Sequence, residues 1–354
     1  MGPSGSIMTV VKADAYGHGL RQIAALLMQA GTDIFGVANL NEARDIRAVG
    51  RGWPIVMLGA CLPDEVGRAV KDNVMPTLST VDEARCFSRV AKKLKRNVSA
   101  HVKVDTGMGR LGVAPAQAAA LLEVIVRLPN VHAVGLYTHY ASVADDAKFS
   151  RQQRTQFQKL IRELEAAGHT FSHVHMNNSA ALLHEPDTDF NLSRPGMLVY
   201  GVLPHGRRRV PVLLKRNLRP ALSWKCCVSL VKEITKGTPL SYGRSFIAPR
   251  RMCVATLTAG YGDGYLCSSA GNAKVLIGGK LCPVLGRVTM DQMLVDISRA
   301  RAAKPGDEAV LIGRQGKQEI TAHQLADWAG TLPLEVLTAI AYRVPRVYRG
   351  GQAA

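Results

Sequence analysis

The sequence predicts an α/β protein in which an N-terminal (β/α)8 barrel is followed by a mostly β C-terminal domain. Two observations lead to this fold class. Short apolar runs alternate with helical patterns up to about residue 200, and each helical stretch has the crossover length that parallel strands need. The pattern then changes to β-rich runs separated by Gly, Pro and Asp turns. We therefore expect residues 1–206 to form the barrel and residues 207–354 to form the β-rich domain.

Eight apolar runs are the expected barrel strands: Ile7–Val11, Ile34–Ala38, Pro54–Leu58, Val74–Leu78, Val98–Val104, Val131–Thr138, Ser172–Met176 and Phe190–Leu192. The helical patterns between or after them are Leu20–Ala30, Leu40–Val49, Pro63–Asp72, Val81–Leu94, Pro115–Leu128, Lys148–Ala167 and Ser179–His184. Thr80 is the expected N-cap of the helix 81–94, because acidic Asp82 and Glu83 follow in its first turn.

The second domain begins after a linker-like stretch, Gly206–Pro211. Its expected strands are Ala221–Val231, Arg251–Leu257, Ala273–Ile277, Lys280–Val284, Met293–Ile297 and Glu308–Ile312. One helical pattern, Thr321–Ala329, comes late in the chain. Turns such as Pro305-Gly306-Asp307 separate the strands, which is typical of an antiparallel sheet.

Composition narrows the class of protein. The chain has 354 residues, of which 47% are hydrophobic and 20% charged, as in an ordinary globular protein. It shows no run of membrane-spanning length and no signal-peptide pattern, so we expect no membrane partner. The seven cysteines are an odd number without zinc spacing, which favours reduced thiols, a cytoplasmic location and no metal site. The net charge is +18, but no nucleic-acid recognition motif accompanies it, so a nucleic-acid partner is not expected.

Polar side chains stand at the ends of several predicted strands, where the active sites of such barrels lie. They are Lys12, Lys103 with Arg110, His139, Asn178, Ser179 and Arg194. Any one of them alone is more often a solvated loop residue. Their recurrence at successive strand ends indicates a shared site on one rim of the barrel.

The chemistry of this rim suggests a phosphorylated cofactor. Phosphate sites in these barrels favour the loops after strands seven and eight, where Ser179 and Gly196 lie, and the Tyr16 hydroxyl adds a donor. A partly desolvated lysine loses its proton more easily, so Lys12 is a candidate for a covalent link to pyridoxal phosphate. Arg194 would face the pyridine nitrogen without giving up its proton, which suits proton exchange at one carbon with few side reactions.

The β domain carries a second group of candidate segments: 240–246 (LSYGRSF), 259–265 (AGYGDGY) and 286–292 (GRVTMDQ). Each segment by itself is more often an ordinary β turn than a functional site.

The sequence resembles the alanine racemases, which are fold-type III pyridoxal-phosphate enzymes with a barrel and a β domain. The motifs that carry the resemblance occur in the family's order, from Ile7 to about Tyr348: VVKADAYGHG, VDTGMGRLG, YTHYA, NNSAALL, RPGM, SYGRSF, AGYGDGY and GRVTMDQ. The resemblance implies interconversion of L- and D-alanine, supplying D-alanine for the cell wall. It also implies a homodimer with shared active sites.

The resemblance implies a role for each candidate residue. Lys12 holds the cofactor and is the base on one face of the substrate, while Tyr242 of the partner subunit acts on the other face. Racemisation needs two opposed groups, because a proton leaves one side and returns on the other. Lys103 matches a lysine that is often carbamylated. The remaining implied roles are His139, Asn178 and Arg194 at the cofactor, Tyr16, Ser179, Gly196 and Met197 at its phosphate, and Arg110, Tyr261 and Met290 at the substrate.

Several positions depart from the family pattern. Only Met1–Ser6 precede the lysine strand, where the family usually has a further strand and helix that cover the barrel seam. Leu334 replaces a gate tyrosine, and Cys267 replaces an arginine of the access channel. Two alternatives therefore stay open. The first is a racemase of broader specificity, for example for serine, and the second is a cofactor-binding protein inactivated by N-terminal truncation. A barrel decarboxylase is disfavoured because it has no need of Tyr242.

Overall fold

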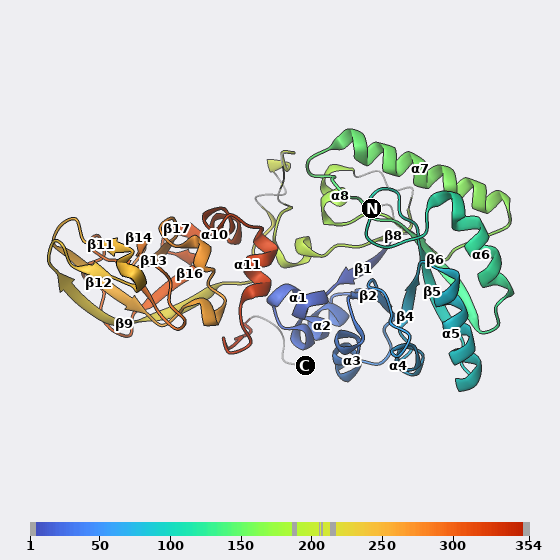
Figure 1. Ribbon diagram of the computed structural model, residues 1–354, viewed down its shortest axis with the longest axis horizontal. Coiled ribbons are helices and arrows are strands. Elements are labelled where there is room, and N and C mark those ends of the chain that lie inside the picture. The colour runs from blue at the N-terminus through green and yellow to red at the C-terminus, as the bar shows by residue number, and fades with distance from the viewer. Residues whose placement is uncertain (1–4, 186–189, 205, 207, 213–216, 350–354) are drawn as a thin grey trace.

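The structure is a computed structural model that describes residues 5–185, 190–204, 206, 208–212 and 217–349. It has two lobes, an N-terminal barrel and a C-terminal sheet domain, with α10 and α11 between them (Figure 1). The expected boundary between residues 206 and 207 involves Arg207, which lies outside the described residues.

Eight parallel strands form the nearly closed barrel and confirm the predicted class. Their order in the sheet is β7-β6-β5-β4-β3-β2-β1-β8. Each strand overlaps a predicted apolar run: β1 (Ser6–Val10), β2 (Ile34–Val37), β3 (Ile55–Met57), β4 (Met75–Leu78), β5 (Val98–Lys103), β6 (Val131–Tyr137), β7 (His173–His175) and β8 (Leu192–Ser193). The chain-first strand β1 pairs with both β2 and β8, so residues from the two ends of the barrel sequence become neighbours.

Helices surround the barrel strands on the outside (Figure 1). They are α2 (Leu20–Gln29), α3 (Leu40–Val49), α4 (Val66–Lys71), α5 (Val81–Leu94), α6 (Ala118–Arg127, after the 3-10 turn η1, Pro115–Gln117), α7 (Ala147–Ala166) and α8 (Ser179–His184). The predicted cap of α5 is confirmed, because the Thr80 side chain accepts a hydrogen bond from the Glu83 amide while the Glu83 carboxylate accepts one from the Thr80 amide.

The C-terminal domain is a seven-stranded antiparallel sheet in the order β13-β14-β15-β12-β9-β16-β17. Six of its strands match predicted runs: β9 (Trp224–Ile234), β12 (Met252–Leu257), β13 (Lys274–Ile277), β14 (Lys280–Leu285), β15 (Met293–Asp296) and β16 (Glu308–Gln315). The short β10 (Pro239–Leu240), β11 (Phe246–Ile247) and β17 (Gln318–Ile320) were not predicted, nor was α11 (Pro333–Ala339), whereas α10 (Ala322–Ala329) was. Three 3-10 turns lie in the described part of this domain: η3 (Tyr242–Arg244), η4 (Tyr261–Asp263) and η5 (Cys267–Ser269). A further one, η2 (Met197–Tyr200), follows β8 of the barrel.

The C-terminal domain closes directly on the segment that follows β1. A Cβ atom on Gly17, whose φ is +81°, would lie 2.2 Å from the carbonyl oxygen of Leu337 in α11. The Arg346 guanidinium donates to the Gly17 carbonyl at 3.3 Å, and the Tyr348 hydroxyl donates to the His18 carbonyl at 2.9 Å. Figure 1 shows α11 beside the first helical turn, so this turn is held from both domains.

In the part of the chain that the structure describes, no helix has both the length and the apolar character needed to cross a membrane. The same residues contain no group of three or more His, Cys, Asp or Glu side chains placed to hold a metal ion. All seven cysteines are unpaired.

Candidate active site

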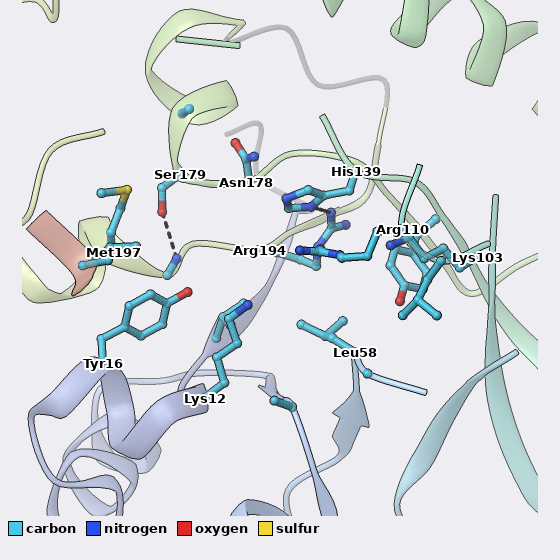
Figure 2. A pocket seen from close by; sticks show the side chains of 18 residues that line it. Lys12, Tyr16, Leu58, Lys103, Arg110, His139, Asn178, Ser179, Arg194 and Met197 are labelled. Carbon is cyan, nitrogen blue, oxygen red and sulfur yellow. Dashed lines mark hydrogen bonds between the residues drawn. The ribbon is translucent and has the colours of Figure 1, made fainter. Parts of the chain in front are cut away.

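Lys12 begins a left-handed helical turn, α1 (Lys12–Gly17). Its next four residues, Ala13 to Tyr16, have φ values of 53–54° and ψ values of 40–55°. A left-handed conformation costs about 1–2 kcal/mol for each residue with a side chain. The sequence predicted only a loop after the strand. It did not predict the left-handed turn, because no sequence pattern marks four consecutive left-handed residues other than glycine. The turn directs both Lys12 and Tyr16 into one cavity (Figure 2).

The cavity has a volume of about 450 Å³ and lies at the carboxyl ends of the barrel strands. Four cationic residues line it, and no Asp or Glu does so among the described residues. The lining consists of Val10, Lys12, Tyr16, Ala38, Leu58, Gly59, Lys103, Arg110, Leu111, Tyr137, His139, Asn178, Ser179, Ala180, Arg194, Gly196, Met197 and Leu334. The structure thus brings together every barrel residue predicted for the site.

Arg194 is 3% exposed, and no carboxylate of the described residues pairs with it. Its Nη2 donates to the carbonyl oxygens of Thr138 at 2.9 Å and Met176 at 3.1 Å, and Nη1 lies 2.6 Å from Nδ1 of His175. Burial lowers the pKa of Arg194 to about 10, which still leaves the guanidinium charged at neutral pH. A fixed cation therefore sits at the inner wall of the cavity.

Two fully buried histidines stand behind this arginine. Because a guanidinium only donates, Nδ1 of His175 accepts, and the proton of that ring lies on Nε2, 2.8 Å from Nδ1 of His101. Burial lowers the pKa of both rings, that of His101 to about 3, so both are neutral. The sequence analysis missed His175, although its position one residue before the end of a predicted strand was a usable signal.

Lys103 is the last residue of β5 and is 2% exposed. Burial, together with the nearby charges of Arg110 and Arg194, lowers its pKa to about 8. Its Nζ lies 5.6 Å from the ring centre of Tyr137, another lining residue that the sequence analysis missed. A large share of Lys103 is therefore the neutral amine near pH 8.

Lys12 has a similar environment. Burial lowers its pKa most, and the Arg110 charge lowers it further, while the Glu42 carboxylate opposes both. His139 lies 3.1 Å from Nη2 of Arg194, and burial together with that charge lowers the His139 pKa well below its ordinary value. The Lys12 amine thus faces neutral or cationic side chains within the cavity, which favours its uncharged, nucleophilic form.

Hydrogen-bond donors gather at the other end of the cavity. The Ser179 hydroxyl oxygen accepts from the Gly196 amide at 2.9 Å, as the dashed line in Figure 2 marks. Burial raises the pKa of Tyr16 to about 12, so its hydroxyl keeps its proton and can donate. The Asn178 side chain caps α8 by accepting from the Ala181 amide at 3.0 Å. Met197 follows Gly196 and lines the same end.

These groups fit pyridoxal phosphate. The cofactor is a compact anion with an aromatic ring, and the cavity offers four cationic side chains, hydroxyl donors at one end and a buried guanidinium at the other. A side chain at position 196 would fill the donor end, because a Cβ atom there would lie 2.6 Å from the Tyr16 hydroxyl oxygen.

We expect Gly196→Ala to weaken cofactor binding about 10- to 100-fold, the cost of losing a hydrogen bond to a charged group, because the new methyl group displaces Tyr16. Titration of cofactor-free protein with pyridoxal phosphate measures this. Gly67→Ala is the matched control, since a Cβ atom at Gly67 meets nothing within 4 Å. Equal affinity in both variants would contradict the assignment of this end to the phosphate.

The three candidate residues of the C-terminal domain lie outside this cavity. Tyr242, Tyr261 and Met290 are 70%, 44% and 53% exposed. Hydrogen bonds connect their loops. The Gly262 amide donates to the Met290 carbonyl at 2.7 Å, and the Ser241 hydroxyl donates to the Arg287 carbonyl at 2.6 Å. Hydrogen bonds therefore join both 240–246 and 259–265 to 286–292, and each segment carries one exposed candidate residue, although Leu240, Tyr265 and Val288 are buried.

Leu334 and Cys267, the two substituted positions of the family pattern, lie in different places. Leu334, on α11, lines the barrel cavity. Cys267 lies in η5 of the C-terminal domain, where its sulfur is 4.0 Å from the Val288 carbonyl oxygen. Only the first of these positions alters the cavity of its own chain.

Comparisons with known proteins agree with this architecture. The family description "Alanine racemase, N-terminal domain" matches residues 1–204, and "Alanine racemase, C-terminal domain" matches residues 221–348. A curated alanine racemase of Carboxydothermus hydrogenoformans is 39% identical over 342 residues, which cover 96% of this chain and 92% of that protein. One of Symbiobacterium thermophilum is 39% identical over 349 residues, covering 98% and 91%.

Solved structures give the same result. An alanine racemase from a D-cycloserine-producing Streptomyces lavendulae matches with a TM-score of 0.92 at 32% identity, covering 99% of this chain and 92% of that one. The alanine racemase of Bacillus anthracis with bound L-Ala-P matches with a TM-score of 0.90 at 31% identity, covering 99% and 90%. On the strength of both domains and these relatives, the chain belongs to the alanine racemase family.

Proposed function

We propose that this protein interconverts L-alanine and D-alanine with pyridoxal 5′-phosphate held in the barrel cavity. The main support is the composition of the cavity. It is lined by Lys12, whose pKa is lowered, and by three further basic residues, and no Asp or Glu among the described residues lines it. The relatives compared above are named alanine racemases, so a broader racemase, a decarboxylase or an inactive binding protein is not favoured.

When bound, the cofactor withdraws electrons from the substrate and makes its Cα hydrogen acidic. Lys12 would hold the cofactor covalently and exchange a proton with the substrate on one face. Arg194 would donate to the ring nitrogen without transferring its proton, because its guanidinium stays charged. This keeps the cofactor a moderate electron sink and limits side reactions. The phosphate would be held by Tyr16, Ser179, Gly196 and Met197, with Asn178 and His139 supporting the cofactor.

We further propose a homodimer in which each subunit completes the other's site. Tyr242 of the partner subunit would be the second base, and the partner's Tyr261 and Met290 would hold the substrate carboxylate with Arg110. The support is that these three large side chains are exposed on loops that hydrogen-bond to one another, because exposed large side chains on adjoining loops are typical of an interaction site.

Lys103 is the proposed site of carbamylation. Its neutral amine would attack carbon dioxide, forming an N–C bond and releasing one proton. The carbamate would be an anion beside Arg110 and Arg194, where a protonated Lys103 would be a further cation. Its attraction to Arg110 would orient the Arg110 side chain.

The pH dependence of stability tests the state of Lys103. A free amine with a folded-state pKa of about 8, against 10.5 unfolded, binds fewer protons in the folded state between these values. The free energy of unfolding should therefore rise by about 3 kcal/mol from pH 8 to 10.5 when carbon dioxide is excluded. Lys103→Met should lack this rise. With labelled bicarbonate, a carbamate carbon should appear in the ¹³C NMR spectrum of the wild type and not of this variant; its absence would remove the proposal.

A cytoplasmic location and a supply of D-alanine for the cell wall complete the proposal. The unpaired state of all seven cysteines supports a reducing compartment.

The central test is purification followed by a cofactor absorbance spectrum and deuterium exchange at Cα of each alanine enantiomer. We expect bound cofactor and exchange from both enantiomers. The same exchange measured with serine and other amino acids distinguishes an alanine racemase from a racemase of broader specificity. Bound cofactor without exchange on any amino acid would overturn the proposed activity.

A further inference from the structure

One carboxylate holds the start of the left-handed turn that carries Lys12. Glu42 lies in the first turn of α3, and its Oε1 accepts a hydrogen bond from the Ala13 amide at 2.7 Å. Its Oε2 accepts from the Ala38 amide at 2.7 Å, in the segment that follows β2. Ala13 directly follows Lys12, and Ala38 lines the cavity. Glu42 therefore ties the lysine turn to the neighbouring strand end.

The other hydrogen bonds of this turn involve other groups: within the turn, the Ala15 amide donates to the Val11 carbonyl at 2.9 Å. The Asp14 carboxylate accepts from the Leu20 amide at 2.7 Å, and Arg346 and Tyr348 donate to the carbonyl groups of Gly17 and His18. None of these bonds reaches the Ala13 amide. A strained backbone persists only where its surroundings hold it, and among the described residues it is Glu42 that holds the Ala13 amide, directly after Lys12.

Glu42 also balances the charge around the turn. Burial and the Arg110 charge lower the pKa of Lys12, whereas the Glu42 carboxylate raises it. The same carboxylate raises the pKa of Tyr16. Both cavity-facing residues of the turn thus lie within the field of one carboxylate.

We propose that Glu42 is a positioning residue, whose carboxylate keeps the Lys12 amine and the Tyr16 hydroxyl directed into the cavity. The inference rests on the proposed function, because it concerns the lysine that is to hold the cofactor. Glu42 does not touch the reacting atoms; it acts through the backbone of Ala13.

The chain offers a matched control. Glu83, in the first turn of α5, accepts with Oε2 from the amides of Ser79 at 2.6 Å and Thr80 at 3.1 Å. Glu42 and Glu83 thus make the same kind of bond in two strand-to-helix connections, but only the first connection contains the lysine turn. Glu42→Ala and Glu83→Ala should both lower the melting temperature, and only the first should change the cavity.

Three measurements on the full chain separate the two variants. In cofactor-free protein, hydrogen exchange at the Ala13 amide should become at least about tenfold faster in Glu42→Ala, since the bond to a charged acceptor is gone. Trace acylation of the Lys12 amine should reach its half-point at a lower pH, because the raising influence of Glu42 is lost. Affinity for added pyridoxal phosphate should fall about 10- to 100-fold. Glu83→Ala should match the wild type within about twofold in all three.

Glu42→Gln keeps one acceptor oxygen and loses the charge, so its affinity should lie between those of the wild type and Glu42→Ala; it also serves if Glu42→Ala does not fold. Equal loss of affinity in the Glu42 and Glu83 variants, or unchanged exchange at Ala13, would overturn the inference. If Lys12→Ala keeps a covalently linked cofactor, the proposed role of Lys12 fails, and with it the premise of this inference. If Lys12→Ala loses the link while the Glu42 variants behave like Glu83→Ala, only the positioning role fails.

Discussion

Lys12→Ala should abolish covalent cofactor attachment and lower the racemisation rate by at least about 10⁴-fold, because one residue supplies both the covalent link and a base. The side chain lies in a cavity, and it makes no hydrogen bond within the part of the chain that the structure describes, so the melting temperature should change little. Borohydride reduction followed by peptide mass spectrometry measures the attachment, and deuterium exchange at Cα measures the rate.

Lys12→Arg is the control for charge. It keeps a cation of similar length, but arginine does not deprotonate at accessible pH and so can be neither nucleophile nor base. We expect it to be as inactive as Lys12→Ala. If either variant still carries the cofactor in covalent linkage, another lysine holds it, and Lys103 is the one other lysine among the described residues that lines the cavity.

Mixing two inactive variants should restore activity if the sites are shared. Tyr242→Phe removes the proposed second base and should slow proton abstraction about 10²- to 10⁴-fold, with one enantiomer affected more than the other. In a hybrid dimer with Lys12→Ala, one site would contain both intact residues and the other neither. An equal, fully exchanged mixture should therefore recover about one quarter of wild-type activity.

The double variant Lys12→Ala/Tyr242→Phe is the control for this mixture. Mixed with either single variant, it forms no site with both residues, so activity should stay at the level of the inactive proteins. No recovery in the first mixture, under conditions where subunit exchange is shown by mass, would mean that Tyr242 does not act across subunits. Equal loss for both enantiomers in Tyr242→Phe would count against two opposed bases.

Local patterns in the sequence determined most of the fold. Short apolar runs predicted all eight barrel strands, and amphipathic patterns predicted the helices α2 to α8, because the residues of each element reflect how that element is buried. The short strands β10, β11 and β17 were missed, since two or three residues are too few to carry a period. Proline at the first position of α11 was a usable signal for the start of a helix. The short apolar run that follows it did not distinguish a helix from a strand.

The sequence by itself also determined which residues meet in the barrel cavity, because the carboxyl ends of parallel strands share one rim. Lys12, Lys103, Arg110, His139, Ser179 and Arg194 needed no more than strand order to be brought together. Only the tertiary structure decided how Lys12 is presented. Its left-handed turn is intrinsically unfavourable, and the contacts that stabilise it come from Glu42, from α11 and from Arg346 at the other end of the chain. Such long-range compensation of local strain has no local sequence pattern.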